Sequence, residues 1–165
     1  MSEQMPPPVA VRVHHVGMSV RSLDEALGFW ERFLGGKPRW RTVLERPYLG
    51  RHVGYPGVRI RAAMVDLPGG GIVELLEYLD EHRADLPDGT SNPGNVHLCL
   101  EVDDARATWM WACECGAIPV VPDGPVVVDS GPNKGAQASY LRIHDGITLE
   151  LFQPPRELAR GYRED

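Results

Sequence analysis

The sequence predicts a mixed α+β protein made of two copies of one strand–helix–strand–strand–strand unit. A histidine opens two similar strand-like runs, His-Val-Gly-Met-Ser-Val from His15 and His-Leu-Cys-Leu-Glu-Val from His97. A helical pattern follows each run. Each half then closes on an acid within an apolar strand, Glu74 in the first half and Glu150 in the second. Because a repeated unit keeps equivalent residues at equivalent places, these four side chains are expected to build one polar site.

The first half has a well-marked helix between strands. Residues 11–20 are rich in β-branched and apolar residues, as in a strand. Ser22 and Glu25 form a capping box, and apolar residues then recur at helical spacing until Gly35. Further strands are expected at about 39–44, 58–66 and 71–78. The first module therefore covers residues 11–78.

The second half repeats this order. A strand at 95–102 precedes a helix that Asp103 or Asp104 caps and that Gly116 ends. Strands are expected at about 118–121, 137–143 and 147–152, which gives a second module over residues 95–153. The remaining segments are a disordered leader (1–10), a polar linker (79–94) and a C-terminal tail (154–165).

Composition excludes several classes of protein. The chain has 165 residues, of which 42% are hydrophobic, and a formal net charge of −6, so a nucleic-acid partner is not expected. No apolar run is long enough to span a membrane, and the first residues do not resemble a signal peptide. The three cysteines favour free thiols over disulfides, so we expect a cytoplasmic protein.

Positive charge is concentrated between residues 39 and 61, where six arginines face one acid. Arginine pairs bind carboxylates and phosphates well, so Arg59 and Arg61 are candidates for binding an anionic substrate. The other interpretation is a solvated outer face of a sheet.

These segments together resemble the vicinal oxygen chelate superfamily, which includes glyoxalase I, methylmalonyl-CoA epimerase, extradiol dioxygenases and the bleomycin resistance proteins. The similarity covers about residues 11–153 and rests on the order of the two histidine strands and the two glutamate strands. It implies a glyoxalase-like fold, in which paired βαβββ modules form curled mixed sheets around a metal site. It also implies the metal ligands, which are His15, Glu74, His97 and Glu150, and a small-molecule substrate with vicinal oxygens. A homodimer is expected by resemblance.

The ligand types indicate a subclass. Two histidines and two glutamates resemble glyoxalase I and the epimerases, with nickel, cobalt, zinc or manganese as the ion. The expected reaction is proton abstraction next to a metal-chelated carbonyl through an enediolate, with Glu74 or Glu150 as the base. The epimerases have a catalytic glutamate on the strand that corresponds to residues 58–66. Here that strand contains no acidic residue before Asp66 at its end, so an epimerase that uses that base does not fit.

Two other functions stay open. An extradiol-type ring-cleaving dioxygenase would use iron and would need Glu74 to be a poor ligand. A metal-free binding or resistance protein would need no ligand set.

Neighbouring residues have secondary roles. Cys99 shares a strand face with His97, and Cys99 and Tyr140 are expected to line the substrate pocket. Strand alternation places His14 on the face opposite His15, so we expect it to be structural. His144 lies in a turn and is expected at the surface.

Overall fold

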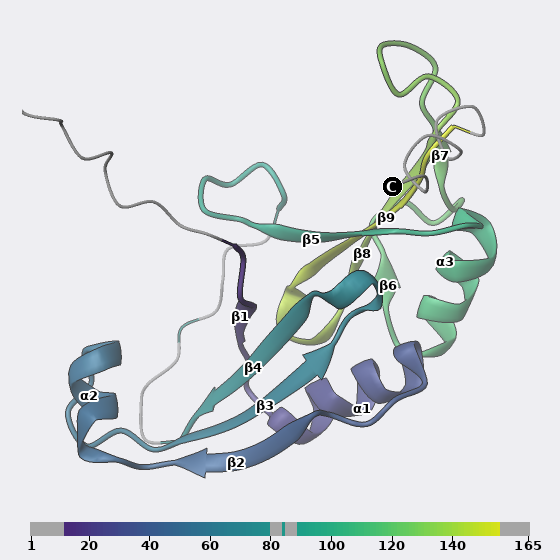
Figure 1. Ribbon diagram of the computed structural model, residues 1–165. Helices are drawn as coiled ribbons and strands as arrows, with labels where there is room; N and C mark the ends of the chain where they lie inside the picture. Colours follow the sequence, from purple (N-terminus) through teal and green to yellow (C-terminus); the bar gives the residue numbers. More distant parts are fainter. Residues whose placement is uncertain (1–11, 80–83, 85–88, 156–165) are drawn as a thin grey trace, which may run out of the picture. The chain divides into compact units, whose positions relative to one another are not determined.

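The computed structural model describes residues 12–79, 84 and 89–155, and it confirms the predicted α+β class (Figure 1). The expected leader 1–10, residues 80–83 and 85–88 of the linker 79–94, and most of the tail 154–165 lie outside the described residues. The chain forms two compact units. Unit 1 contains Met1–Leu23 and Lys37–Glu81, and unit 2 contains Asp24–Gly36 and His82–Asp165. We describe each unit by itself.

Unit 1 is built on a four-stranded mixed sheet in the order β1-β4-β3-β2. The strands are β1 (Val16–Ser19), β2 (Trp40–Leu44), β3 (Ile60–Asp66) and β4 (Ile72–Tyr78). β1 runs parallel to β4, and the other pairs are antiparallel. Alternation along β4 buries Val73 and Leu75 completely on one face and leaves Glu74 on the other. The sheet therefore presents Glu74 on the face opposite this buried pair.

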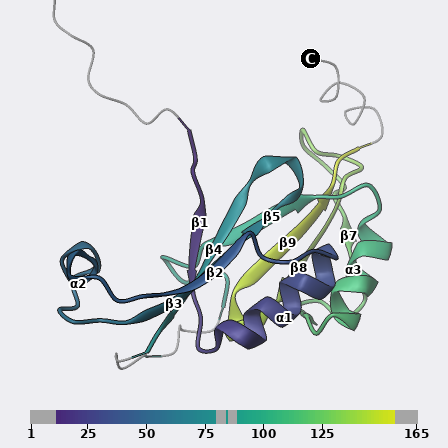
Figure 2. The ribbon, with the colours of Figure 1, turned by 60° about the horizontal axis from the view of Figure 1, so that its bottom comes forward.

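A short helix that the sequence does not predict, α2 (Pro47–Val53), connects β2 to β3. Pro47 begins it, and Gly54 ends it in the left-handed conformation (φ 83°). Figures 1 and 2 both show α2 at the end of unit 1 where β2 and β3 meet. Leu49 of α2 is buried in one cluster with Ile60 of β3. Hydrophobic packing thus attaches α2 to the sheet.

Unit 2 repeats the sheet in the order β5-β9-β8-β6, with β7 also paired to β8. The strands are β5 (His97–Glu101), β6 (Ile118–Pro119), β7 (Val126–Val127), β8 (Gln137–Arg142) and β9 (Thr148–Gln153). β5 runs parallel to β9, as β1 does to β4, and β8 and β9 are antiparallel. Leu149 and Leu151 are fully buried on the face of β9 that faces away from Glu150. The predicted duplication of the strand arrangement is therefore present.

The two long helices begin and end where the capping signals indicate. In α3 (Ala105–Glu114), the carboxylate of Asp104 accepts a hydrogen bond of 2.9 Å from the N–H of Ala107. α1 (Leu23–Leu34) ends at Gly35, whose φ is 70°. None of the helices in the described part of the chain is both long and apolar enough to cross a membrane.

Most of α1 belongs to unit 2, although it follows β1 in the chain. The guanidinium of Arg32 donates a 2.8 Å hydrogen bond to the carbonyl of Cys115, at the end of α3. The indole of Trp111 donates a 3.0 Å hydrogen bond to the carbonyl of Phe33. The compact units therefore differ from a division of the chain into consecutive modules at 11–78 and 95–153, because the first helix joins the second sheet.

Candidate metal centre

The first predicted histidine and glutamate come together in unit 1. His15 directly precedes β1, and Gly17, two residues further, pairs with Glu74 of β4. This pairing brings the start of β1 beside Glu74, so that the imidazole of His15 can reach the carboxylate. The Nε2 atom of His15 lies 3.2 Å from Oε2 of Glu74, and 35% of the histidine side chain is exposed. Both groups are therefore accessible to a ligand from solvent.

Unit 2 contains the same arrangement. His97 begins β5, and Cys99, two residues further, pairs with Glu150 of β9. The Nε2 atom of His97 lies 3.0 Å from Oε2 of Glu150, and 40% of the histidine side chain is exposed. The two units thus each hold one imidazole–carboxylate pair built by the same parallel strand pairing.

The donor atoms of each pair fit a divalent transition metal. Imidazole nitrogen and carboxylate oxygen bind such ions at about 2.1 Å, so two adjacent ligands at a right angle lie about 3.0 Å apart. The two measured separations, 3.2 and 3.0 Å, match this value. They also fit a direct ion pair when the imidazole is protonated. Within the described ranges, no group of three or more His, Cys, Asp or Glu side chains gathers as a possible metal site.

Cys99 and Tyr140 flank Glu150. Both are paired with it across neighbouring strands, Cys99 from β5 and Tyr140 from β8. The ring of Tyr140 also lies 5.1 Å from that of His97, centroid to centroid. Burial and then the negative charge of Glu150 raise the pKa of the Cys99 thiol to about 12 and also raise the pKa of Tyr140. Both groups are therefore protonated at neutral pH, and Cys99 can donate a hydrogen bond to the carboxylate.

The surroundings of Glu74 are different. Its paired neighbours across the strands are Gly17 and Met64, which offer no side-chain hydrogen-bond donor. The Nδ1 atom of His14, however, lies 2.7 Å from Nδ1 of His15. The expectation that His14 faces away from His15 is wrong, because β1 begins only at Val16 and strand alternation does not apply before it.

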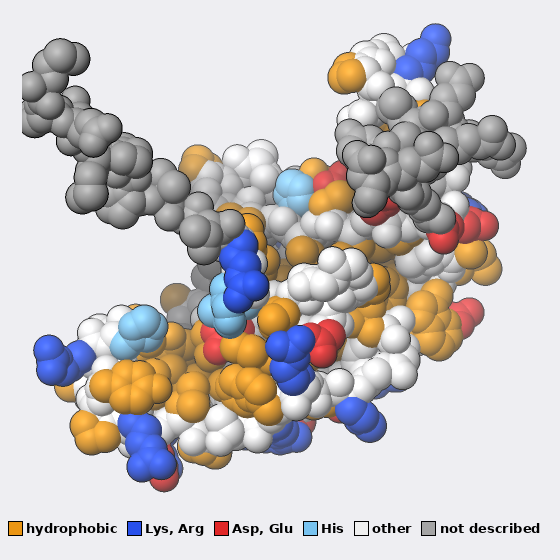
Figure 3. Space-filling view, in the orientation of Figure 1, with side chains coloured by type: hydrophobic (Ala, Val, Ile, Leu, Met, Phe, Trp, Pro, Cys, Tyr) orange, Lys and Arg blue, Asp and Glu red, His pale blue; other side chains and the backbone are white. Residues whose placement is uncertain are grey.

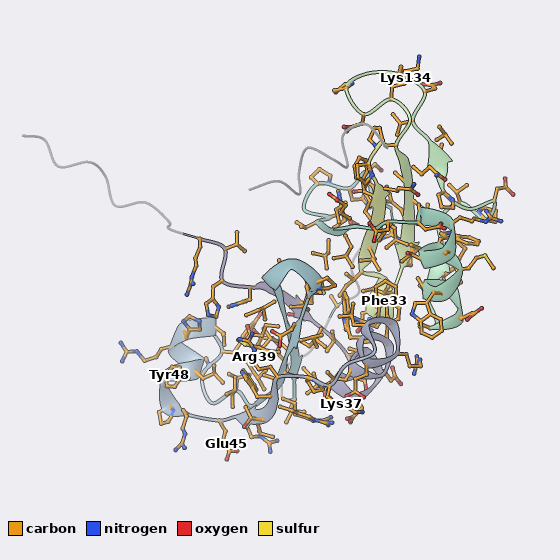
Figure 4. All side chains as sticks on the ribbon, turned by 45° about the vertical axis from the view of Figure 1, so that its right-hand side comes forward. Phe33, Lys37, Arg39, Glu45, Tyr48 and Lys134 are labelled. Carbon is orange, nitrogen blue, oxygen red and sulfur yellow. The ribbon has the colours of Figure 1, made fainter. Side chains whose placement is uncertain are left out.

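The candidate arginines lie away from this face. Arg61 pairs with Glu77 across β3 and β4, and alternation puts both on the face opposite Glu74. The guanidinium of Arg61 donates to the Glu77 carboxylate at 2.8 Å, and Arg59 is exposed just before β3. Arg39, labelled in Figure 4, binds Asp66 at 2.6 Å. The structure thus gives Arg61 and Arg39 structural ion pairs.

The Glu74 face of unit 1 becomes apolar toward α2. Hydrophobic side chains gather over α2 and the strands beside it in Figure 3. Leu76 and Tyr78 follow Glu74 on the same face of β4 and pack against the buried cluster under α2. Figure 4 places Tyr48 of α2 at the periphery of this end. A ligand held at Glu74 would therefore find a nonpolar surface beside it.

His144 is buried, which corrects its expected surface position. Only 7% of its side chain is exposed, and burial lowers its pKa from 6.5 to about 4. The burying groups include the rings of Phe29 and Trp30 from α1, a contact over more than 110 residues of sequence that local patterns do not predict. His144 is accordingly a structural residue.

Comparison with known proteins identifies the family. The model of the Glyoxalase/Bleomycin resistance protein/Dioxygenase superfamily matches residues 14–140. The chain belongs to this superfamily. The matched segment contains His15, Glu74 and His97, and it ends before Glu150.

Comparison with individual proteins and solved structures finds further similarities. A 2-epi-5-epi-valiolone epimerase from Actinomyces sp. is 30% identical over 152 residues, which are 90% of this chain and 82% of the epimerase. A glyoxalase family protein from Bacillus cereus has a TM-score of 0.75 at 24% identity and covers 92% of this chain and 99% of its own. A glyoxalase I variant from Zea mays has a TM-score of 0.60 at 16% identity, covering 87% of this chain and 46% of its own. The two structures support the glyoxalase-like fold.

Proposed function

We propose that this protein is a divalent-metal-dependent isomerase or lyase that removes a proton next to a metal-chelated carbonyl. The observation that carries the proposal is the duplicated pair, His15 with Glu74 at 3.2 Å and His97 with Glu150 at 3.0 Å. We assign all four side chains as ligands of one ion of nickel, cobalt, zinc or manganese. The ion would withdraw electron density from a substrate carbonyl and so acidify the neighbouring C–H group.

The protein residues would hold the ion and move the proton. His15 and His97 bind through Nε2, the atom that each already directs at its glutamate. Glu74 or Glu150 accepts the substrate proton and returns it to the same or a neighbouring carbon, so that the reaction is an epimerisation or isomerisation. Cys99 and Tyr140, next to Glu150, are assigned to substrate contact.

The substrate class follows from the same residues. Two oxygens on adjacent carbons can occupy the two coordination positions that four protein ligands leave on an octahedral ion. The relation to a 2-epi-5-epi-valiolone epimerase supports 2-epi-5-epi-valiolone as the first compound of this class to test. An anionic substrate and a homodimer remain part of the proposal. Arg59 and Arg61 remain the candidates for binding the anionic group, and the guanidinium of Arg61 also binds Glu77.

Solvent exchange tests the proposal. Purified protein loaded with each metal is incubated in deuterated water with 2-epi-5-epi-valiolone, dicarbonyl–thiol adducts, acyl-CoA thioesters and catechols. We expect solvent deuterium at the carbon next to the carbonyl of a processed substrate. Oxygen consumption with an unlabelled, ring-opened catechol would overturn the proposal in favour of a dioxygenase. Tight binding of a small molecule to metal-free protein, without turnover, would favour a binding protein.

A further inference from the structure

We propose that His14 is a positioning residue that fixes the ring of His15 for metal binding. This inference rests on the proposed function, because it concerns the same metal centre. Its basis is the 2.7 Å separation between Nδ1 of His14 and Nδ1 of His15, together with the 3.2 Å separation between Nε2 of His15 and Glu74. The two nitrogens of one imidazole thus have different partners.

The proton positions follow from the chemistry of imidazole. A neutral imidazole carries its proton on one nitrogen only, and a metal binds the other. If Nε2 of His15 binds the ion, its proton sits on Nδ1, where it donates a hydrogen bond to Nδ1 of His14. His14 must then carry its own proton on Nε2. With His14 as the acceptor, the hydrogen bond stabilises the tautomer of His15 that leaves Nε2 free for the metal.

The position of His15 explains why such a partner is useful. His15 lies outside β1, which begins at Val16, so the ladder of the sheet does not constrain its backbone. The side chain is also partly exposed, with 35% of its surface open to solvent. An acceptor at Nδ1 holds the ring and reduces the entropy lost when the metal binds.

The second module provides an internal comparison. The repeat places Val96 where His14 stands in the first module, and Val96 is 77% exposed. His97 instead has the ring of Tyr140 beside it, 5.1 Å away between centroids. A hydrogen bond to a preceding imidazole is thus specific to His15, and Val96 is a matched control position.

The test measures Co²⁺ affinity of the full-length, metal-free protein from the visible absorption of the bound ion. We expect His14→Leu to weaken binding about 10- to 100-fold, the usual effect of losing such a partner. His14→Asn should bind within a few-fold of wild type, because its side-chain oxygen is two bonds beyond Cβ, as Nδ1 is. Val96→Ala should bind as wild type does. Because His14 is exposed, all three variants should fold, which far-UV circular dichroism checks.

The outcomes separate the two proposals. Wild-type affinity in His14→Leu, or a loss that His14→Asn does not restore, would overturn the positioning role and leave the metal site standing. Unchanged Co²⁺ affinity in His15→Ala would overturn the metal site itself. Weakening by Val96→Ala equal to that of His14→Leu would show that any change beside a histidine has this effect, which also contradicts the inference.

Discussion

The indole N–H of Trp30 donates a hydrogen bond to Nε2 of His144 across 2.9 Å. Trp30 is fully buried in α1, and His144 lies in the turn between β8 and β9. The bond uses the lone pair of the imidazole and therefore requires a neutral His144. It joins the helix and the sheet turn within unit 2.

This relationship predicts a pH-dependent stability. The pKa of His144 is lowered from 6.5 to about 4, so its contribution is complete above pH 6.5 and is lost as the pH falls toward 4. The unfolded chain binds the extra proton over this window, which favours unfolding. The shift corresponds to a loss of about 3 kcal/mol in the free energy of unfolding.

Urea denaturation between pH 7 and pH 4 measures this loss. The variant His144→Gln keeps a hydrogen-bond acceptor for Trp30 but does not titrate, so its stability should change less over the same window. A variant at the exposed His52 serves as the control and should behave as wild type. An equal loss in His144→Gln and wild type would refute the assignment.

Glu77 is predicted to stabilise unit 1 without affecting the metal centre. Its carboxylate accepts hydrogen bonds from Arg61 at 2.8 Å and from the N–H of Leu23 at 3.0 Å, on the face of β4 opposite Glu74. Removal in Glu77→Ala leaves a half-buried guanidinium and a helix N–H without their acceptor, so we expect a loss of about 2 kcal/mol in unfolding free energy.

Urea denaturation should show the loss of stability in this variant, whereas metal titration should show no loss of affinity. Glu77→Ala should bind metal with wild-type affinity, and the exposed Glu101→Ala should change neither property. Weaker metal binding by folded Glu77→Ala would contradict the separation of the two faces.

Cys99 should react slowly with alkylating reagents although it is exposed. Its pKa of about 12 gives a thiolate fraction at pH 8 roughly a thousand times lower than that of an ordinary thiol. Glu150→Gln removes the nearby negative charge and should accelerate the reaction, since Glu150 is, after burial, the next cause of the raised pKa. Mass spectrometry of iodoacetamide-treated, metal-free protein measures both rates. Rapid labelling of Cys99 in wild type would show that the pKa of its thiol is not raised.

Gly50 is predicted to be essential for the attachment of α2. A Cβ atom at this position would lie 2.7 Å from the carbonyl oxygen of Tyr55 and 2.9 Å from Cα of Pro56, which are backbone atoms. We expect Gly50→Ala to cost roughly 1–3 kcal/mol in unfolding free energy, as overpacking does. Gly36→Ala, which meets open space, is the control. Equal melting temperatures of the two variants would refute the close approach of the Tyr55–Pro56 backbone to Gly50.

The sequence predicts the regular elements well because their signals are local. Asp104 and Gly116 bracket α3, and the alternation of polar and buried residues marks β4 and β9. The helix α2 escapes prediction because Pro47, Gly50 and Gly54 are typical of loops, and packing on the sheet decides its conformation.

The same distinction applies to the site. The pairs His15–Glu74 and His97–Glu150 are predictable because the repeat preserves them and parallel pairing brings them together. The burial of His144 depends on α1, which is distant in sequence. His14 is not predicted because β1 begins at Val16 and not at about residue 11, where the hydrophobic pattern starts, although two adjacent histidines are a visible signal.

Metal stoichiometry in the wild type and in two double variants tests the central claim most directly. One variant removes the first pair (His15→Ala with Glu74→Ala) and the other removes the second (His97→Ala with Glu150→Ala). Equilibrium dialysis against nickel or cobalt should give one ion per wild-type chain and at least about 100-fold weaker binding in each variant, because each pair would supply half of the proposed ligands. Wild-type affinity in either folded variant would contradict a metal centre that uses both pairs.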